Sequence, residues 1–112
     1  LPPTPTVLPP VSVRGLAGLR APEGCVLPGV IRTRVTGLNI RTVSFYRDGR
    51  LVKRVKAGST RLRTFTLRTR VRASDFALHT VVVRVRFVQG ARPSSKTLLH
   101  RFAQCRIAGV TG

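Results

Sequence analysis

Short runs of alternating apolar and polar residues occupy most of the chain, with turn-forming residues between them. The clearest run is residues 79–88 (HTVVVRVRFV), in which every second side chain from Val81 to Phe87 is apolar. The same period of two appears in residues 31–36, 40–47, 50–55, 60–71 and 97–105. A period of two is typical of a strand with one buried face, and no helical period of useful length is present. The pattern therefore predicts an all-β domain.

The phase of each run predicts which side chains face the core. Apolar or small residues share one face in each, namely Ile31, Thr33 and Val35; Val43 and Phe45; Phe65 and Leu67; and Leu98, His100 and Phe102. Asp48-Gly49 is a two-residue hairpin signal between two such runs. Leu62 is out of phase with Phe65, which predicts a bulge or bend between them. About seven short strands at this spacing favour a β-sandwich.

The N-terminal residues follow a different pattern. Residues 1–10 hold five of the eight prolines and are expected to be extended, near polyproline II. Val11 and Val13 then alternate across Ser12. We therefore divide the chain into an extended Pro-rich segment, residues 1–20, which is a candidate donor strand, and a sandwich, residues 21–112. The alternative is that residues 11–19 are the first strand of the same domain.

Two cysteines, Cys25 and Cys105, bracket almost all of the patterned region. A disulfide across so long a loop would stabilise a small domain and would indicate an extracellular or cell-surface location. The alternative is two unrelated buried thiols. The first residue is Leu1, which predicts a processed form or an excised part of a longer chain. No apolar run approaches the length of a membrane-spanning helix, so no membrane span is expected.

Charge is the strongest compositional signal. Lys and Arg number 21 against three acids, and the formal net charge is +18. Such a field attracts polyanions, and a preference for Arg suits the recognition of phosphate and carboxylate groups, although a GC-rich genome would also favour Arg. The candidate anion-binding residues recur at period two and are Arg32, Arg34, Arg61, Arg63, Arg68, Arg70, Arg72, Arg84 and Arg86. They would form a flat basic sheet, for which a solvated strand face is the alternative interpretation.

Catalytic chemistry has little support in the sequence. Asp48 is explained by the hairpin turn, and Asp75 could imitate a triad with a histidine and a serine, but no G-x-S-x-G motif is present. His79 and His100 lack the spacing of a zinc site, and both are expected to be structural. We expect no enzymatic activity, no cofactor and no metal. Only Tyr46 shares an outer face with the arginines, which favours binding to a polyanion backbone rather than to bases.

The paired cysteines and the hairpin FYRDGR around Asp48 and Gly49 resemble an Arg-rich immunoglobulin-like domain of bacterial surface and secreted proteins. The resemblance covers about residues 25–105. It implies a Greek-key sandwich of about seven strands in which the disulfide joins the start of the second strand to the end of the last. The chain departs from antibody domains because it has no Trp and a different cysteine spacing. His100 also stands where an aliphatic residue is expected.

These observations lead to two functional hypotheses. The first is a subunit of a cell-surface filament or pilus-like fibre, in which an N-terminal strand is added to the neighbouring copy, giving a head-to-tail homopolymer. The residues expected to insert are Val7, Leu8, Val11, Val13 and Leu16. The alternative is a polyanion-binding module whose partner is DNA, an anionic wall polymer or an acidic polysaccharide.

Overall fold

The regular structure of the chain consists entirely of strands within the residues that the computed structural model describes, 13–59 and 61–106. All the strands that the alternating runs predict are present. In chain order they are β1 (Val13–Arg14), β2 (Leu16–Arg20), β3 (Gly24–Val26), β4 (Gly29–Leu38), β5 (Ile40–Arg47), β6 (Arg50–Ser59), β7 (Arg63–Val71), β8 (His79–Phe87), β9 (Ala91–Arg92) and β10 (Ser95–Gln104).

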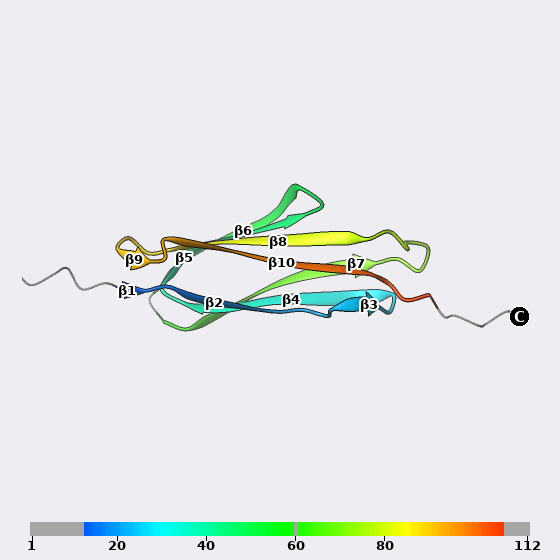
Figure 1. Ribbon diagram of the computed structural model, residues 1–112, viewed down its shortest axis with the longest axis horizontal. Coiled ribbons are helices and arrows are strands. Elements are labelled where there is room, and N and C mark those ends of the chain that lie inside the picture. The colour runs from blue at the N-terminus through cyan, green and yellow to red at the C-terminus, as the bar shows by residue number, and fades with distance from the viewer. Residues whose placement is uncertain (1–12, 60, 107–112) are drawn as a thin grey trace, which may run out of the picture.

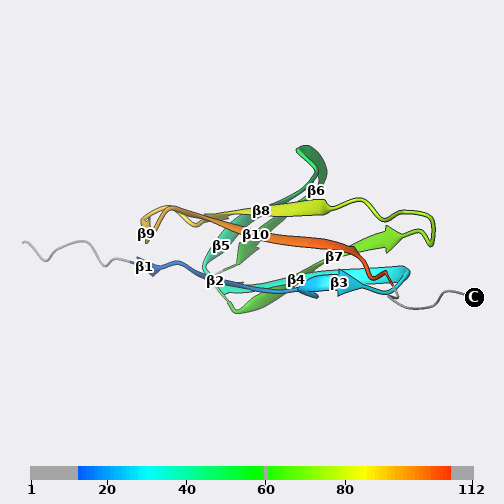
Figure 2. The same ribbon diagram turned by 45° about the vertical axis from the view of Figure 1, so that its right-hand side comes forward.

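The strands form two facing layers, which make a β-sandwich (Figures 1 and 2). One layer is a five-stranded sheet in the order β3-β10-β8-β5-β6, and the other is a three-stranded sheet in the order β2-β4-β7. Strands β1 and β9 form a short third pair. All pairings are antiparallel except those of β3 with β10 and of β1 with β9, which are parallel.

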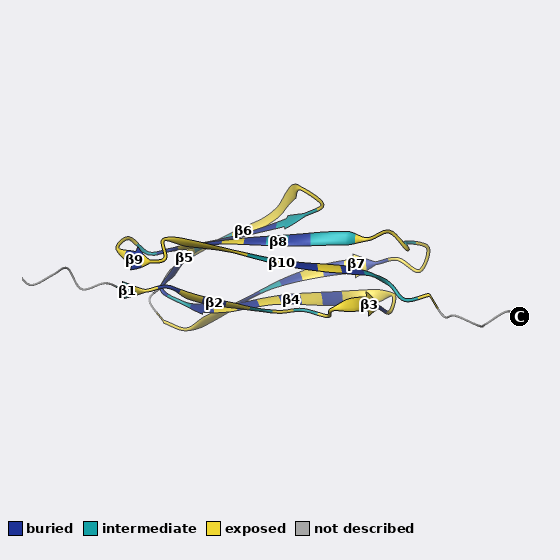
Figure 3. Ribbon diagram, viewed as in Figure 1, coloured by how far each residue is buried: buried dark blue, intermediate teal, exposed yellow. Residues whose placement is uncertain are grey.

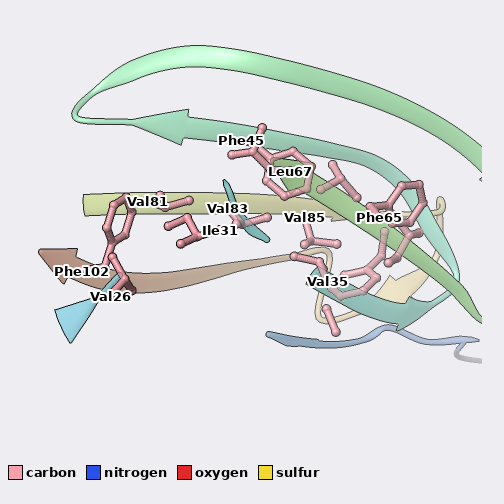
Figure 4. Packing of buried hydrophobic residues seen from close by; sticks show 14 of the residues in the cluster. Val26, Ile31, Val35, Phe45, Phe65, Leu67, Val81, Val83, Val85 and Phe102 are labelled. Atoms are coloured by element: carbon pink, nitrogen blue, oxygen red, sulfur yellow. The ribbon is translucent and has the colours of Figure 1, made fainter. Parts of the chain in front are cut away.

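The core lies between the two layers and is built from the inward stripes of the strands (Figure 4). Val81, Val83 and Val85 of β8 are fully buried, and they face the three-stranded sheet, which contributes Val35 at 0% exposure. The predicted inward residues of β4, β5 and β7 are all buried, as are His100 and Phe102 of β10. The outer faces are largely exposed (Figure 3). Each fully buried Val or Phe side chain contributes about 1.5–3 kcal/mol by removal of apolar surface from water.

The turns agree with the sequence in one place and differ in another. Asp48 and Gly49 connect β5 to β6 with left-handed φ angles of 50° and 85°, as the two-residue hairpin signal predicts. No bulge separates Leu62 from Phe65. Leu62 instead lies before β7 begins and is 68% exposed. Because Leu62 is not part of the strand, it does not have to point to the same face as Phe65.

Residues 13–20 are part of the sandwich, so the predicted boundary at residues 20/21 does not match the structure. Val13 pairs with Ala91, and β2 pairs along its whole length with β4 of the same chain. Gly15 joins the two strands, where an added Cβ would lie 2.5 Å from the Phe87 ring. Leu16 is 48% exposed rather than inserted into a groove. Val7, Leu8 and Val11 lie outside the described residues.

The predicted disulfide is present. Cys25 in β3 is bonded to Cys105, which follows β10, and the amide of Cys105 donates to the carbonyl of Val26. Strand β3 is only three residues long and has β10 as its single neighbour, so the covalent bond holds a short edge strand in place. No helix in the described part of the chain is long and apolar enough to cross a membrane.

Candidate anion-binding surface

Five arginines project from the outer face of the three-stranded sheet, which we call the arginine face. Inward residues alternate with outward ones along each strand, so Arg20 of β2, Arg32 and Arg34 of β4, and Arg68 and Arg70 of β7 share this side. All five are exposed. Two pairs are directly opposite each other across neighbouring strands, Arg20 with Arg34 and Arg32 with Arg68.

These cross-strand pairs bring like charges together. The Cβ atoms of directly opposite residues lie about 4.5–5.5 Å apart, and like charges at that distance destabilise a sheet. Strands β2, β4 and β7 contain no Asp or Glu that could compensate. An anionic group placed over the face would relieve this repulsion, since each guanidinium presents a planar fork of donors to phosphate or carboxylate oxygens.

The other predicted arginines do not join this face. Arg84 and Arg86 project from β8 on the outer side of the opposite, five-stranded sheet. Arg84 lies over the ring of Tyr46, with 5.3 Å between the guanidinium carbon and the ring centroid. The expected single flat basic sheet is therefore two separate basic faces, because β8 pairs with β5 and β10 and not with β4 or β7.

Three predicted arginines lie near the ends of β7. Arg63 has the inward phase of that strand, donates from Nη1 to the carbonyl of Ala57 at 3.1 Å, and lies over the Phe65 ring. Arg61 precedes the strand, and Arg72 follows it, where its carbonyl accepts from the amide of Asp75. The period-two spacing does not place Arg61 and Arg63 with Arg68 and Arg70, because the first pair has the inward phase of Phe65 and Leu67 and the second pair has the outward phase.

His79 bridges two carboxylates in a polar cluster that the sequence analysis predicted only in part. His79 Nδ1 lies 2.7 Å from Asp48 Oδ2, and His79 Nε2 lies 2.8 Å from Asp75 Oδ2. The other oxygen of each carboxylate accepts a backbone amide, from Thr80 and Ala77 respectively. Two of the three acids of the chain are thus engaged at the start of β8.

The protonation states in this cluster follow from the contacts. The hydrogen bond to Asp48, reinforced by the bond to Asp75, raises the pKa of His79 against the opposing effect of burial. The amide of Ala77 and then His79 lower the pKa of Asp75. The pKa of Asp48 is also lowered, because its hydrogen bonds to His79 and Thr80 together outweigh desolvation. The raised pKa of His79 favours the imidazolium, in which both ring nitrogens donate to the two carboxylates and neither has a lone pair free to accept a proton.

Only part of this cluster had a signal in the sequence. Asp75 and His79 are four residues apart, which brings them close in the chain. Asp48 is 31 residues from His79 and reaches it only because β5 pairs with β8, with Arg47 opposite Val81. The prediction that Asp48 serves the hairpin turn is therefore correct, but Asp48 has a second role as the hydrogen-bond partner of His79.

Comparison with known proteins adds evidence on the fold alone. The chain matches no model of a known protein family and no curated protein sequence. Among solved structures it is similar to the sulfur carrier protein SoxY from Chlorobium limicola f thiosulfatophilum, with a TM-score of 0.59 and 14% sequence identity. The similarity covers 80% of this chain and 79% of that chain. At this level of identity, the two chains share a fold over most of their length.

Proposed function

We propose that this chain is a non-enzymatic domain that binds a polyanion through the arginine face of sheet β2-β4-β7. The observation that supports this most directly is the pair of cross-strand contacts, Arg20 with Arg34 and Arg32 with Arg68, on strands without an acid. No aromatic side chain lies among the outward residues of these strands. Binding is therefore to the charged groups along the polymer and is insensitive to base sequence.

The non-enzymatic part of the proposal is supported by the state of His79. A general base needs a free lone pair near the proton that it removes. Both ring nitrogens of His79 are engaged by carboxylates, and His100, the other histidine, lies in the core at 6% exposure.

The experiment compares matched pairs of substitutions on the two basic faces. Arg32→Gln with Arg68→Gln removes two charges from the arginine face, and Arg84→Gln with Arg86→Gln removes two from the opposite sheet. Affinities for heparin and for a duplex DNA are measured from 50 to 300 mM salt, values chosen to bracket about 150 mM, where the Debye length is about 8 Å. The first variant should bind more weakly, and its log–log salt slope for DNA should be smaller by about 2. Equal losses in the two variants, or binding that is insensitive to salt, would contradict the proposal.

The fold assignment in this proposal is immunoglobulin-like. In such domains, one sheet contains neighbouring strands C, F and G, extended by C′ in the variable type, and the other contains A, B and E. The order β10-β8-β5-β6 corresponds to G-F-C-C′, and β2-β4-β7 corresponds to A-B-E, without a strand D. The Cys25–Cys105 bond supports a location outside the cytosol, where such bonds persist.

A filament subunit is the second candidate, and an apolar surface at one end of the sandwich favours it. Leu27 is 73% exposed and Phe76 is 43% exposed, and with Pro28 they line a cavity of about 620 Å³ beside Cys105. Strand β1, from which the Pro-rich segment extends, lies at the opposite end (Figures 1 and 2). Proline-rich segments in polyproline II form bind grooves that contain aromatic side chains, and Phe76 is the aromatic residue of this lining, with the guanidinium of Arg106 over its ring.

The lengths of the segments favour docking between copies. The ten residues of β4 span about 33 Å between the two ends of the sandwich. Val7 and Leu8 are five or six residues from Val13 and reach at most about 20 Å from it. These residues cannot reach the apolar cavity of their own chain, and in this candidate they bind that of the next copy, head to tail.

Deleting residues 1–12 tests the filament candidate, because it leaves β1 and β2 intact. Size-exclusion chromatography with light scattering and negative-stain images should show assemblies for the full chain and monomers for the truncated one. Phe76→Asp should also prevent assembly, whereas Leu99→Asp, at an exposed position on another surface, should not. A monomeric full chain at all concentrations would exclude this candidate without affecting the polyanion proposal.

A further inference from the structure

A cavity opens at the edge of the sandwich where the chain crosses from β2 to β3. It has a volume of about 450 Å³ and lies between residues 19–23, strand β4 and strand β10. Arg20, Arg32 and Arg34 of the arginine face line it, together with Glu23 and His100. Lys96 of β10 bridges the two sheets at the same edge by donating to the carbonyl of Ala17 at 2.8 Å.

His100 has a buried polar atom without a partner. The residue is 6% exposed, its Nε2 lies 2.8 Å from the hydroxyl oxygen of the fully buried Thr33, and its Nδ1 contacts no polar group in the described part of the chain. A buried donor or acceptor that is left unsatisfied loses its hydrogen bonds to water without replacement and so destabilises the fold. An unsatisfied atom on a residue that lines a cavity suggests that a ligand or a water supplies the missing bond.

The protonation state of His100 determines whether its unpaired ring nitrogen donates or accepts a hydrogen bond, and so which kind of ligand group can bind to it. Burial lowers the pKa of His100, so the ring is neutral near pH 7, although the charge of Glu23 acts in the opposite direction. In a neutral imidazole, one nitrogen donates and the other accepts. The Thr33 hydroxyl can donate to Nε2, which leaves Nδ1–H as the unpaired donor of a residue that lines the cavity. The ring is held by stacking on Phe102, with 5.7 Å between centroids.

We propose that this cavity is a site for a single tetrahedral oxyanion, a phosphate or sulfate group, held by the guanidinium groups of Arg20, Arg32 and Arg34 and by His100 Nδ1–H, directly or through one water. Three arginines and Glu23 give a net charge of +2, which matches a dianion. The inference rests on the proposed function, because the oxyanion belongs to the bound polymer and the cavity adjoins the arginine face.

The arrangement differs from that of a second basic cavity, which shares no residue with the first. A cavity near β9 is lined by Arg41, Lys56 and Arg86 and is similarly large, at about 640 Å³. In the described part of the chain, none of the buried side-chain atoms that lack a hydrogen-bond partner belongs to the lining of this cavity. Its three cations are exposed, like the three arginines of the first cavity. The lining of this cavity contains three cations and no acid, so charge alone would favour an anion there. Stronger binding at the first cavity would therefore isolate the contribution of His100.

Nuclear magnetic resonance of the two imidazole rings provides the test, since His79 and His100 are the only histidines and His79 serves as an internal reference. The full chain is titrated with inorganic phosphate, with sulfate and, as a control, with chloride at matched ionic strength. We expect a saturable shift at His100 and none at His79. Whichever of phosphate and sulfate binds more tightly indicates whether the polymer is a phosphate or a sulfate ester.

Variants then separate this inference from the proposed function. Arg20→Gln with Arg34→Gln removes two charge-assisted contacts and should weaken phosphate or sulfate binding about tenfold or more, whereas Arg41→Gln with Arg86→Gln should not weaken it. A second variant, His100→Gln, should weaken binding if the cavity is occupied as proposed. The absence of a saturable shift at His100, or equal losses in both arginine variants, would overturn the inference. If the inference is overturned in this way and the wild-type chain is still retained on heparin, the proposed polyanion-binding function stands. If the wild-type chain is not retained on heparin, both the oxyanion site and the polyanion-binding function are rejected.

Discussion

Removing the disulfide should destabilise the domain by several kcal/mol, mainly through the unfolded state. The bond joins residues 80 positions apart in the chain. In the chain-entropy treatment, a closed loop of that length lowers the entropy of the unfolded ensemble enough to stabilise the fold by about 4.5 kcal/mol at 25 °C. For a domain of this size, each kcal/mol shifts the melting temperature by about 4–8 °C. Cys25→Ser with Cys105→Ser should therefore lower it by about 20–35 °C.

Removing the disulfide should also loosen strand β3 locally, in addition to lowering the free energy of unfolding of the whole domain. Strand β3 pairs only with β10, over three residues, and β10 has no other neighbour on that side. Without the bond, β3 should exchange its amide hydrogens faster than β8, which is central in the sheet. Urea denaturation gives the free energy of unfolding and its slope with denaturant, and hydrogen exchange gives the protection of each strand.

Three outcomes of the disulfide experiment are informative. A free energy loss of about 4–5 kcal/mol with a steeper denaturant slope would support the entropic account, because the unfolded chain would expose more surface. A loss below about 1 kcal/mol would refute the reasoning that the loop constraint governs stability. Equal loss of protection in β3 and β8 would refute the local effect.

Three further predictions concern single side chains. His79→Phe should cost most stability between about pH 4 and pH 6.5. The raised pKa of His79 gives a stabilisation that is complete below its ordinary value of 6.5 and is lost as the pH rises through the folded pKa. The lowered pKa values of Asp48 and Asp75, ordinarily 3.8, give a stabilisation that is complete above 3.8 and is lost as the pH falls through their folded pKa values. The difference between the wild-type and variant unfolding profiles is the readout, because it cancels the separate titration of His100; a flat difference would contradict the cluster. Gly15→Val should destabilise by about 1–3 kcal/mol in urea denaturation, because its side chain would overlap Phe87; an unchanged midpoint would argue against this packing. Asn39→Ala should cost about 1–3 kcal/mol by the same assay, because Asn39 has a φ of 60° and donates from its side chain to the carbonyl of Arg14, and a neutral result would argue against both contributions.

The inward face of each strand was predictable because it depends on local sequence. Successive side chains of a strand point to opposite sides, so the apolar stripe of residues 81–87 identifies the buried face of β8 without knowledge of its neighbours. The left-handed turn at Asp48-Gly49 is equally local, since Asp and Gly tolerate positive φ angles and most other residues do not. The pairing of the two cysteines followed from their being the only two in the chain.

Strand neighbours were not predictable by the same means. A period of two assigns Arg32, Arg68 and Arg84 to outward faces, but it carries no information on which strands pair. The first two are opposite each other across β4 and β7, whereas Arg84 lies on the other sheet. The same holds at the N-terminus, where an alternating segment pairs equally well with a neighbouring copy or with its own chain, and the structure pairs Leu16–Arg20 with β4 of the same chain.

The polar sites depend on tertiary structure most of all. His79 meets Asp48 across 31 residues, and His100 meets Thr33 across 67. A hydrogen bond between such distant residues forms only after the sheets have been ordered and their registers set, because a shift of one residue would turn each side chain to the opposite face. The sequence alone therefore determined the class of fold, the buried faces and the high positive charge, while the assembly of the sheets decided where that charge gathers and which polar atoms are left to bind a ligand.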